Sequence, residues 1–267
     1  MDTQQTIRQP AVAGLFYPDD PATLKQQILA LMSQASPRGK VASHPKALVA
    51  PHAGLPYSGP VAASAYAALG TGADQIRRVV LLGPSHRVPF RGVATTAATA
   101  YRTPLGVVPI DRTAVEAIGG LPGVTNLDEA HGPEHSLEVH LPFLQVILHD
   151  FTLVPLVVGE AGPETVAAIL EQLWGGPETL IVISSDLSHY HDYLTAQALD
   201  AETSRAIESC DEGQLDPYKA CGYQPLAGLL RVARRRGLKI ETLDLRNSGD
   251  TAGPRREVVG YGAWAFH

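Results

Sequence analysis

Hydrophobic positions along the chain form short continuous runs that alternate with longer amphipathic stretches. Runs such as "RRVVLL" and "TLIVIS" are apolar without interruption, which is typical of strands covered on both faces. The runs predict strands over Lys46–Ala50, Arg78–Leu82, Gly92–Ala100, Gly106–Pro109, Leu153–Val158, Leu180–Ser184, Lys239–Asp244 and Val258–Phe266. The amphipathic stretches predict helices over Pro21–Gln34, Val61–Leu69, Thr113–Ile118, Ser136–Leu148, Pro163–Trp174, Leu194–Ser209 and Pro225–Arg236.

The last part of the chain breaks this alternation. "LKIETLDLRNSGD" and "REVVGYGAWAFH" are two strand-like stretches with no helix between them. The earlier alternation favours a sheet with helices on both faces, and the final pair makes that sheet mixed. We therefore expect an α/β fold: one domain over residues 1–267, with a mixed central sheet flanked by helices on both faces.

Composition narrows the class of protein. The chain has 267 residues, 45% of them hydrophobic, and a formal net charge of −6. Its basic cluster, Arg231–Lys239, falls at the end of a predicted helix, where cations complement the helix dipole. An acidic chain without a broad basic face is not typical of a nucleic-acid binder. The N-terminus lacks the pattern of a secretory signal, and no stretch approaches the roughly 20 apolar residues of a membrane span. We expect a cytoplasmic protein whose two cysteines are reduced.

Candidate chemistry lies where the strands end. His52 in "ALVAPHAG" and His86 in "VVLLGPSHR" each follow an apolar run, and "LIVISSDLSHY" delivers Asp186 and His189. Open α/β sheets bind ligands beyond the carboxyl ends of their strands, so these side chains are expected to converge. If a helical turn begins at Asp186, its carboxylate lies beside His189 and can orient that imidazole as a general base.

Two further stretches add candidates. "HGPEHSLEVHLPFLQ" places His135 at a predicted helix start, but its spacing is not that of the metalloprotease helix. Glu134 and Glu138, four residues apart, could equally form a solvated acidic face. Cys221 precedes a predicted helix, a position that lowers the pKa of a thiol and favours the thiolate. Two histidines and a third anionic ligand form a transition-metal site, and a thiolate third ligand leaves Fe(II), Cu(I) and Zn open.

Six motifs together resemble the Memo family, whose microbial members include protein B of the AmmeMemoRadiSam system. They are "AVAGLFYP", "LVAPHAGLPYSG", "LLGPSH", "EHSLEVHLPFLQ", "SSDLSHY" and "ACGYQP", and the match runs from Ala11 to the C-terminus. The family is similar in fold to class III extradiol dioxygenases, which bind non-haem Fe(II) through two histidines and a glutamate. Carried onto this sequence, the resemblance implies metal ligands at His52, His86 and Cys221. It places the acid/base pair at His189 and Asp186 and a pocket residue at His135.

The resemblance implies a transition-metal cofactor, with Fe(II) or copper ahead of zinc, and dioxygenase-like redox chemistry on a small molecule. A thiolate in place of the glutamate alters metal preference and is itself oxidisable, so ring cleavage does not follow. The family also implies an alternative. Its eukaryotic members are described as adaptors for phosphotyrosine peptides, so the same pocket could bind a peptide, an anion or a partner without turnover. The other AmmeMemoRadiSam proteins are candidate partners.

Overall fold

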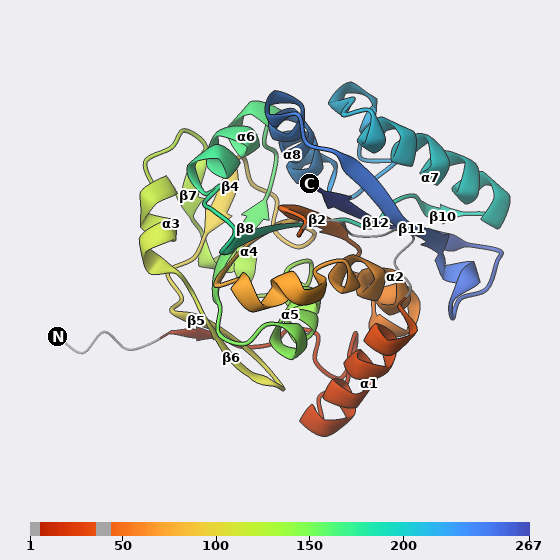
Figure 1. Cartoon of the computed structure of the whole chain (residues 1–267), viewed down its shortest axis with the longest axis horizontal. Coiled ribbons are helices and arrows are strands. Elements are labelled where there is room, and N and C mark those ends of the chain that lie inside the picture. The colour runs from red at the N-terminus through yellow and green to blue at the C-terminus, as the bar shows by residue number, and fades with distance from the viewer. Residues whose placement is uncertain (1–5, 36–43) are drawn as a thin grey trace.

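The computed structural model describes residues 6–35 and 44–267, and its central feature is a mixed sheet (Figure 1). The strands are β1 (Ile7–Arg8), β2 (Ala47–Ala50), β3 (Arg78–Pro84), β4 (Val93–Thr95), β5 (Ala100–Thr103), β6 (Gly106–Pro109), β7 (Val124–Asn126), β8 (Thr152–Val158), β9 (Thr179–Ser184), β10 (His189–His191), β11 (Ile240–Asn247) and β12 (Val258–Phe266). The α-helices are α1 (Pro21–Gln34), α2 (Leu55–Ala67), α3 (Arg112–Ile118), α4 (Asp128–His131), α5 (Leu141–Ile147), α6 (Pro163–Gln172), α7 (Tyr193–Glu208) and α8 (Tyr223–Arg236). Short 3₁₀ helices are η1 (Gly70–Gln75), η2 (Glu138–His140), η3 (Glu212–Gln214) and η4 (Ser248–Asp250).

Within the described residues, nine strands form the main sheet in the order β10-β12-β2-β9-β3-β8-β4-β7, with β11 also paired to β12. The four central strands β2, β9, β3 and β8 are mutually parallel. Strands β4 and β12 pair with them in antiparallel fashion, so the sheet is mixed, as the sequence predicts. Strands β1, β5 and β6 form a separate small sheet.

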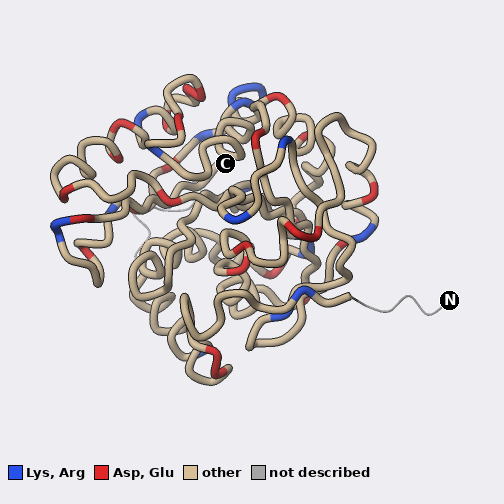
Figure 2. Tube along the Cα trace, turned by 180° about the vertical axis from the view of Figure 1, so that it is seen from behind, with Lys and Arg blue, Asp and Glu red and all other residues tan. Residues whose placement is uncertain are grey.

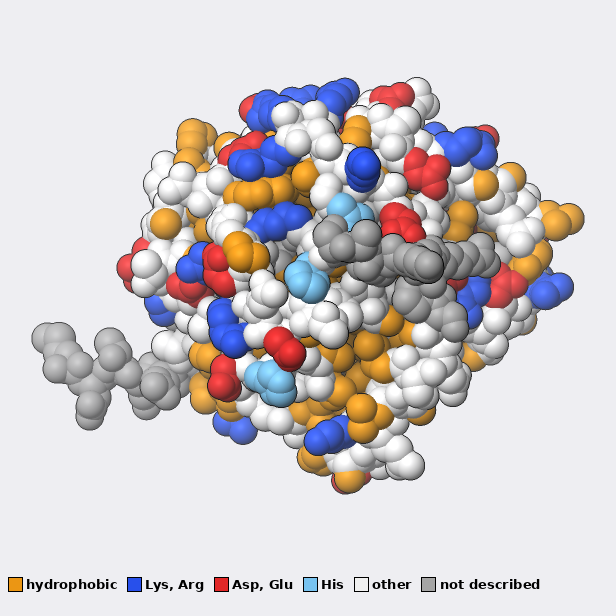
Figure 3. All heavy atoms as spheres, in the orientation of Figure 1, with side chains coloured by type: hydrophobic (Ala, Val, Ile, Leu, Met, Phe, Trp, Pro, Cys, Tyr) orange, Lys and Arg blue, Asp and Glu red, His pale blue; other side chains and the backbone are white. Residues whose placement is uncertain are grey.

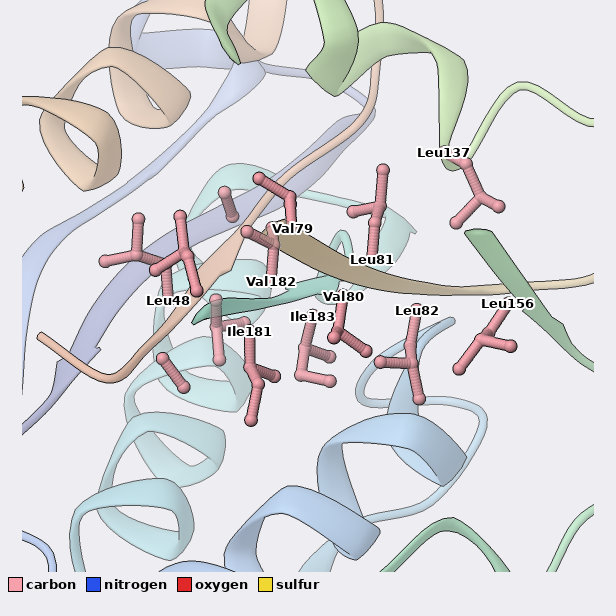
Figure 4. Packing of buried hydrophobic residues seen from close by; sticks show 14 of the residues in the cluster. Leu48, Val79, Val80, Leu81, Leu82, Leu137, Leu156, Ile181, Val182 and Ile183 are labelled. Carbon is pink, nitrogen blue, oxygen red and sulfur yellow. The ribbon is translucent and has the colours of Figure 1, made fainter. Parts of the chain in front are cut away.

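Helices cover both faces of the main sheet. Figure 1 shows α1, α2 and α5 on one side and α6, α7 and α8 on the other. Helix α2 packs on β2, β11 and β12, whereas α8 packs on β3 and β9. The central strands are therefore buried on both faces, which explains why their sequences are continuously apolar. In Figure 4, Leu81 points to one face of the sheet while Val80 and Leu82 point to the other.

The predicted elements differ from the structure mainly where one pattern covers two elements. Residues 92–100 contain β4 and the first residue of β5, and these two strands pair in different sheets. The helix predicted over Ser136–Leu148 begins later, as η2 followed by α5, so His135 lies in the loop before it. Helix α2 begins at Leu55, six residues before its prediction, because a proline in its first turn suits a helix start. The helix predicted over Pro225–Arg236 ends as α8 at Arg236, and the glycine that follows it, Gly237, adopts the left-handed conformation with φ of 65°.

Charged residues of both signs are interspersed along the described trace (Figure 2) and across the face seen in Figure 3. The basic end of α8 is paired rather than free. Arg231 and Arg235 contact Glu164 of α6, and Arg231 and Arg234 contact Glu212 of η3. Among the described residues, no helix is both long and apolar enough to cross a membrane.

Candidate metal centre

The sheet register brings the strand-end residues together. The parallel strands β2, β9 and β3 are consecutive neighbours, and they end at Ala50, Ser184 and Pro84. The residues two positions beyond these ends are His52, Asp186 and His86. Because parallel strands finish at the same edge, equal offsets from neighbouring ends place the side chains side by side. The predicted convergence of these three residues is a feature of the structure.

Three imidazoles form the centre of the site. The ring centroids of His52 and His86 lie 5.1 Å apart, and His135 lies 5.5 Å from the first and 4.7 Å from the second. One ligand atom from each of the three lies within 4.8 Å of the others. His135 comes from the loop before η2, far from the central strands in sequence. The structure thus groups His135, expected as a pocket residue, with the two predicted ligands.

His86 is held by the carboxylate of Glu134. The ring Nδ1 lies 2.9 Å from Glu134 Oε1, and the backbone amide of His86 donates to Oε2 at 2.6 Å. Oε1 also accepts from the amides of His135 and Ser136. Burial alone would raise the pKa of Glu134, but these hydrogen bonds, led by those from His86, lower it to about 2. An ionised carboxylate therefore accepts from Nδ1–H of His86, and the Nε2 of that ring has no part in the contact.

His52 is more deeply buried, with 2% of its surface exposed, and its contacts are different. Its Nδ1 lies 2.5 Å from the hydroxyl of Ser184, the last residue of β9. Its backbone amide donates to Asp186 Oδ1 at 2.8 Å. The other ring nitrogen, Nε2, lies 3.4 Å from Sγ of Cys221. The ring is thus fixed through Nδ1, with Nε2 pointing toward the thiol.

Cys221 lies beside the cluster because the turn before α8 is tied to the end of β9. Its amide donates to the Asp186 carbonyl at 3.2 Å, and the amide of Asp186 donates to Sγ at 3.3 Å. A Cβ on Gly222 would sit 2.4 Å from the Ser184 carbonyl oxygen, so only glycine permits this approach. Burial, and then the charge of Asp186, raise the pKa of the Cys221 thiol. This direction is opposite to the one expected for a thiol at a helix start.

Asp186 and His189 both line the pocket, but they do not form the helical turn that would place them on one face. Residues 185–188 are irregular, and His189 begins the short strand β10. The Asp186 carboxylate instead holds the backbone of His52. Burial raises the pKa of Asp186 to about 6, and burial lowers the pKa of His189. The orientation of His189 by Asp186 remains a prediction without a supporting contact.

A pocket of about 620 Å³ opens onto the cluster. Besides the three imidazoles it is lined by Asp186, His189 and aromatic side chains, among them Phe16, Tyr57 and Tyr261. The ring of Phe16 packs edge-on against His135 with 4.9 Å between centroids. Its carbonyl also accepts from the amide of Leu55 at 2.8 Å, which attaches the N-terminal turn to the start of α2. The N-terminal segment is therefore one wall of the pocket.

Glu138 holds this N-terminal wall in place. The carboxylate is fully buried and accepts hydrogen bonds from the Arg8 guanidinium, the Tyr17 hydroxyl and the amides of Ala11 and Val12. A buried carboxylate is tolerated when it is paired and hydrogen-bonded in this way. Glu134 and Glu138, considered above as a possible solvated face, are thus both buried. Glu138 holds the N-terminal segment beside the pocket.

The chemistry of these donors suits a transition metal. Burial lowers the pKa of His52 far below its usual value and that of His135 to about 4. Both imidazoles are therefore neutral at neutral pH and present lone pairs, the form that binds a metal. Nδ1 of His135 is buried without a hydrogen-bond partner, although it lies 3.3 Å from Glu134 Oε1. An unpartnered buried nitrogen in a histidine cluster is consistent with an absent ligand.

Sequence reasoning identified the side chains at the strand ends and missed those behind them. Ser184 and Glu134, which hold the two predicted ligands, drew no functional prediction. The available signal for Glu134 is its position directly before His135. The signal for Ser184 is a hydroxyl at the last position of a buried strand, next to the Asp186 motif.

Comparisons with known proteins agree with the motifs. The profile of the Memo-like protein family matches residues 8–265. A MEMO1 family protein of Methanothermobacter thermautotrophicus is 36% identical, over 96% of this chain and 98% of the relative. One from Thermotoga maritima is also 36% identical, over 95% and 97%. The crystal structure of an uncharacterised Escherichia coli K12 protein superposes with a TM-score of 0.52 at 14% identity, covering 82% of this chain and 98% of that one. The last likeness is one of fold alone.

Proposed function

The chain belongs to the Memo-like protein family, and from that premise we propose that it is a metal-dependent redox protein acting on a small organic molecule. The proposal is that His52 and His86 bind a transition metal ion, Fe(II) or copper ahead of zinc. The observation that carries it is the geometry of the two rings. Each has its Nδ1 occupied by an acceptor of its own, Ser184 or Glu134, so both offer Nε2 to the same space.

When bound, such a metal would supply redox chemistry of the kind found in class III extradiol dioxygenases, the group that the family resembles. The chain's own residues have separate tasks. The aromatic walls of the pocket bind the organic substrate and exclude water from it. His189 lines the same pocket, and burial favours its neutral form, so its imidazole can accept a proton from a substrate hydroxyl. Asp186 keeps the His52 loop in register with β9 through the amide of His52.

We propose Cys221 as the third ligand, since its Sγ already lies 3.4 Å from His52 Nε2. Metal binding would displace the proton that burial keeps on this thiol, and a thiolate then favours soft ions such as Cu(I). His135 is the competing third ligand because it belongs to the imidazole cluster. If Cys221 is the third ligand, His135 instead faces the substrate as a catalytic residue.

Cobalt(II) substitution separates the two. We expect the wild type to show a near-ultraviolet thiolate-to-cobalt charge-transfer band that is lost in Cys221→Ser and kept in His135→Ala. A wild type without this band, together with loss of affinity in His135→Ala, would assign the third position to His135 instead.

The competing function is a binding module for an anion, a peptide or an AmmeMemoRadiSam partner. Neutral imidazoles do not favour an anion, because they lack the positive charge that would attract it. Metal analysis after anoxic, reducing purification tests the site itself. We expect stoichiometric metal in the wild type and none in the double variant His52→Ala/His86→Ala. Equal metal in both would refute the proposed site.

Turnover is tested separately, by oxygen consumption with Fe(II) or Cu(I) across a panel of phenolic substrates. We expect uptake that requires both the metal and His189. A protein that binds metal at the predicted residues but consumes no oxygen with any of them would be a binding module.

A further inference from the structure

Behind His52 lies a buried chain of polar side chains that does not touch the pocket. The hydroxyl of Ser184 lies 2.5 Å from His52 Nδ1, 2.9 Å from Nε2 of His140 and 2.6 Å from the carbonyl oxygen of Ser136. On the other side of the His140 ring, Nδ1 lies 2.8 Å from the hydroxyl of Tyr66. The side chains of Tyr66, His140 and Ser184, and that of His52 in front of them, are at most 2% exposed, so water does not compete for their hydrogens.

Counting hydrogens settles the direction of each bond. A carbonyl oxygen only accepts, so the single hydroxyl hydrogen of Ser184 is donated to Ser136. The oxygen of Ser184 then has only lone pairs left for its two imidazole neighbours. Both rings must therefore donate to it, His52 through Nδ1–H and His140 through Nε2–H.

The same count of hydrogens also assigns the bond between His140 and Tyr66. Because the Nε2 of His140 carries its hydrogen, Nδ1 of a neutral ring is an acceptor, and the Tyr66 hydroxyl donates to it. Burial lowers the pKa of His140 to about 3, so the ring is neutral at neutral pH. Every hydrogen in the chain has one place, and reversing one bond would leave two donors or two lone pairs facing each other.

We propose that Ser184, His140 and Tyr66 are positioning residues for the metal site, which fix His52 as the Nδ1–H tautomer with Nε2 free to bind. This inference rests on the proposed function only in assigning His52 as a ligand. Without the Ser184 acceptor, His52 loses the partner that sets its tautomer, and a fraction of rings carries the hydrogen on Nε2, where it blocks the ligand position. Groups of this kind typically contribute about 10–100-fold to metal affinity.

The molecule contains a matched control. Tyr101 and His131 form a second buried pair, with the hydroxyl 2.6 Å from Nδ1 of His131 and Nε2 of His131 3.0 Å from the Ala94 carbonyl oxygen. The same count makes Nε2–H the donor and Nδ1 the acceptor. This pair ends on a backbone carbonyl rather than on Ser184, so Tyr101→Phe matches Tyr66→Phe in chemistry and burial, but its hydrogen bonds do not lead to His52.

The experiment begins without metal. Nitrogen-15 NMR of histidine-labelled, metal-free protein should show His52 protonated on Nδ1 in the wild type and in Tyr101→Phe. It should show a mixture of tautomers in Ser184→Ala and a smaller shift toward the mixture in Tyr66→Phe. A wild-type His52 protonated on Nε2, or an unchanged tautomer in both Ser184→Ala and Tyr66→Phe, would overturn the inference.

Zinc titration of the same variants supplies the second readout. We expect affinity about 10–100-fold weaker in Ser184→Ala, less weakened in Tyr66→Phe and unchanged in Tyr101→Phe. If Ser184→Ala does not fold, Tyr66→Phe against Tyr101→Phe carries the test. Equal affinities in that pair, with no change in the tautomer of His52, would refute the proposal. A wild type that binds none of zinc, Fe(II) and Cu(I) but shows the Nδ1–H tautomer would refute the proposed function and leave the tautomer assignment of His52 standing.

Discussion

The two predicted metal ligands are held by different chemistry, although each stands two residues beyond a neighbouring parallel strand. His86 is partly exposed, and an ionised carboxylate, Glu134, holds its ring and its backbone amide. His52 is buried, and a neutral hydroxyl, Ser184, takes its ring hydrogen. The carboxylate near His52, Asp186, takes only the backbone amide. The His86 half of the site is thus held by a charged carboxylate, and the ring of His52 in the other half is held by a neutral hydrogen-bond network.

The pKa values of the two carboxylates show what this difference means. Burial opposes ionisation in both. Four hydrogen bonds reach Glu134 and lower its pKa to about 2, whereas burial prevails at Asp186 and raises its pKa to about 6. The His86 half therefore gains stability from its negative charge, and the His52 half loses stability by carrying one. The Glu134 carboxylate is itself buried, so its four hydrogen bonds, rather than water, compensate its charge.

The largest expected effect comes from Glu134→Gln, which removes the charge behind His86. The carboxamide nitrogen would face the backbone amide of His86, so two donors would meet in a buried position. We expect zinc affinity to fall about 10–100-fold. The matched control is Glu160→Gln, an exposed carboxylate paired with Arg91. Loss of the same size in the control would show that the effect is not specific to the site.

Glu134→Gln should also change how the free energy of unfolding depends on pH. The folded-state pKa of Glu134 lies below its unfolded value of about 4.5, so its contribution is present above pH 4.5 and lost as pH falls toward 2. Urea unfolding of the metal-free protein should show the wild type losing more stability than Glu134→Gln over that range, by about 3 kcal/mol. Parallel profiles would contradict the assigned shift.

Asp186→Asn should change the pH dependence of stability in the opposite direction to Glu134→Gln. The folded-state pKa of Asp186 is raised from 3.8 to about 6, so ionisation costs stability as pH rises from about 4 through 6. The asparagine oxygen can still accept from the amide of His52. We expect the metal-free variant to gain up to about 3 kcal/mol over the wild type between pH 4 and 8, measured by urea unfolding. A difference independent of pH would contradict the contrast between the two halves.

The smallest effect concerns His135, whose ring has no acceptor of its own. Phe16→Leu keeps bulk against this ring but removes the edge-on aromatic contact, worth about 0.5–1.5 kcal/mol. We expect zinc affinity to fall by less than about tenfold. Phe151→Leu, a phenylalanine that precedes β8 at the other edge of the sheet, should leave affinity unchanged. If Phe16→Leu loses more zinc affinity than Glu134→Gln, the N-terminal wall contributes more to the site than Glu134 does.

The sequence by itself determined the central strands whose ends carry His52, His86 and Asp186, and most of the helices that cover them. These depend on local rules: continuous apolar runs mark strands buried on both faces, and polar residues directly beyond them lie at one edge of the sheet. It also predicted the mixed sheet, because two strand-like stretches followed each other without a helix. The family motifs supplied Cys221 as a ligand, a role still to be tested.

Only the tertiary structure decided which groups stand behind those residues. Strand order put β9 between β2 and β3, which brings the Ser184 hydroxyl to His52. The loop before η2 carries Glu134 to His86 from about 50 residues away. Hydrogen-bond partners distant in sequence depend on how strands and loops pack, and hydrophobic periodicity carries no information about that. The same packing raises the pKa of Cys221 and lowers that of His135, because burial, which sequence position does not specify, sets the cost of charge.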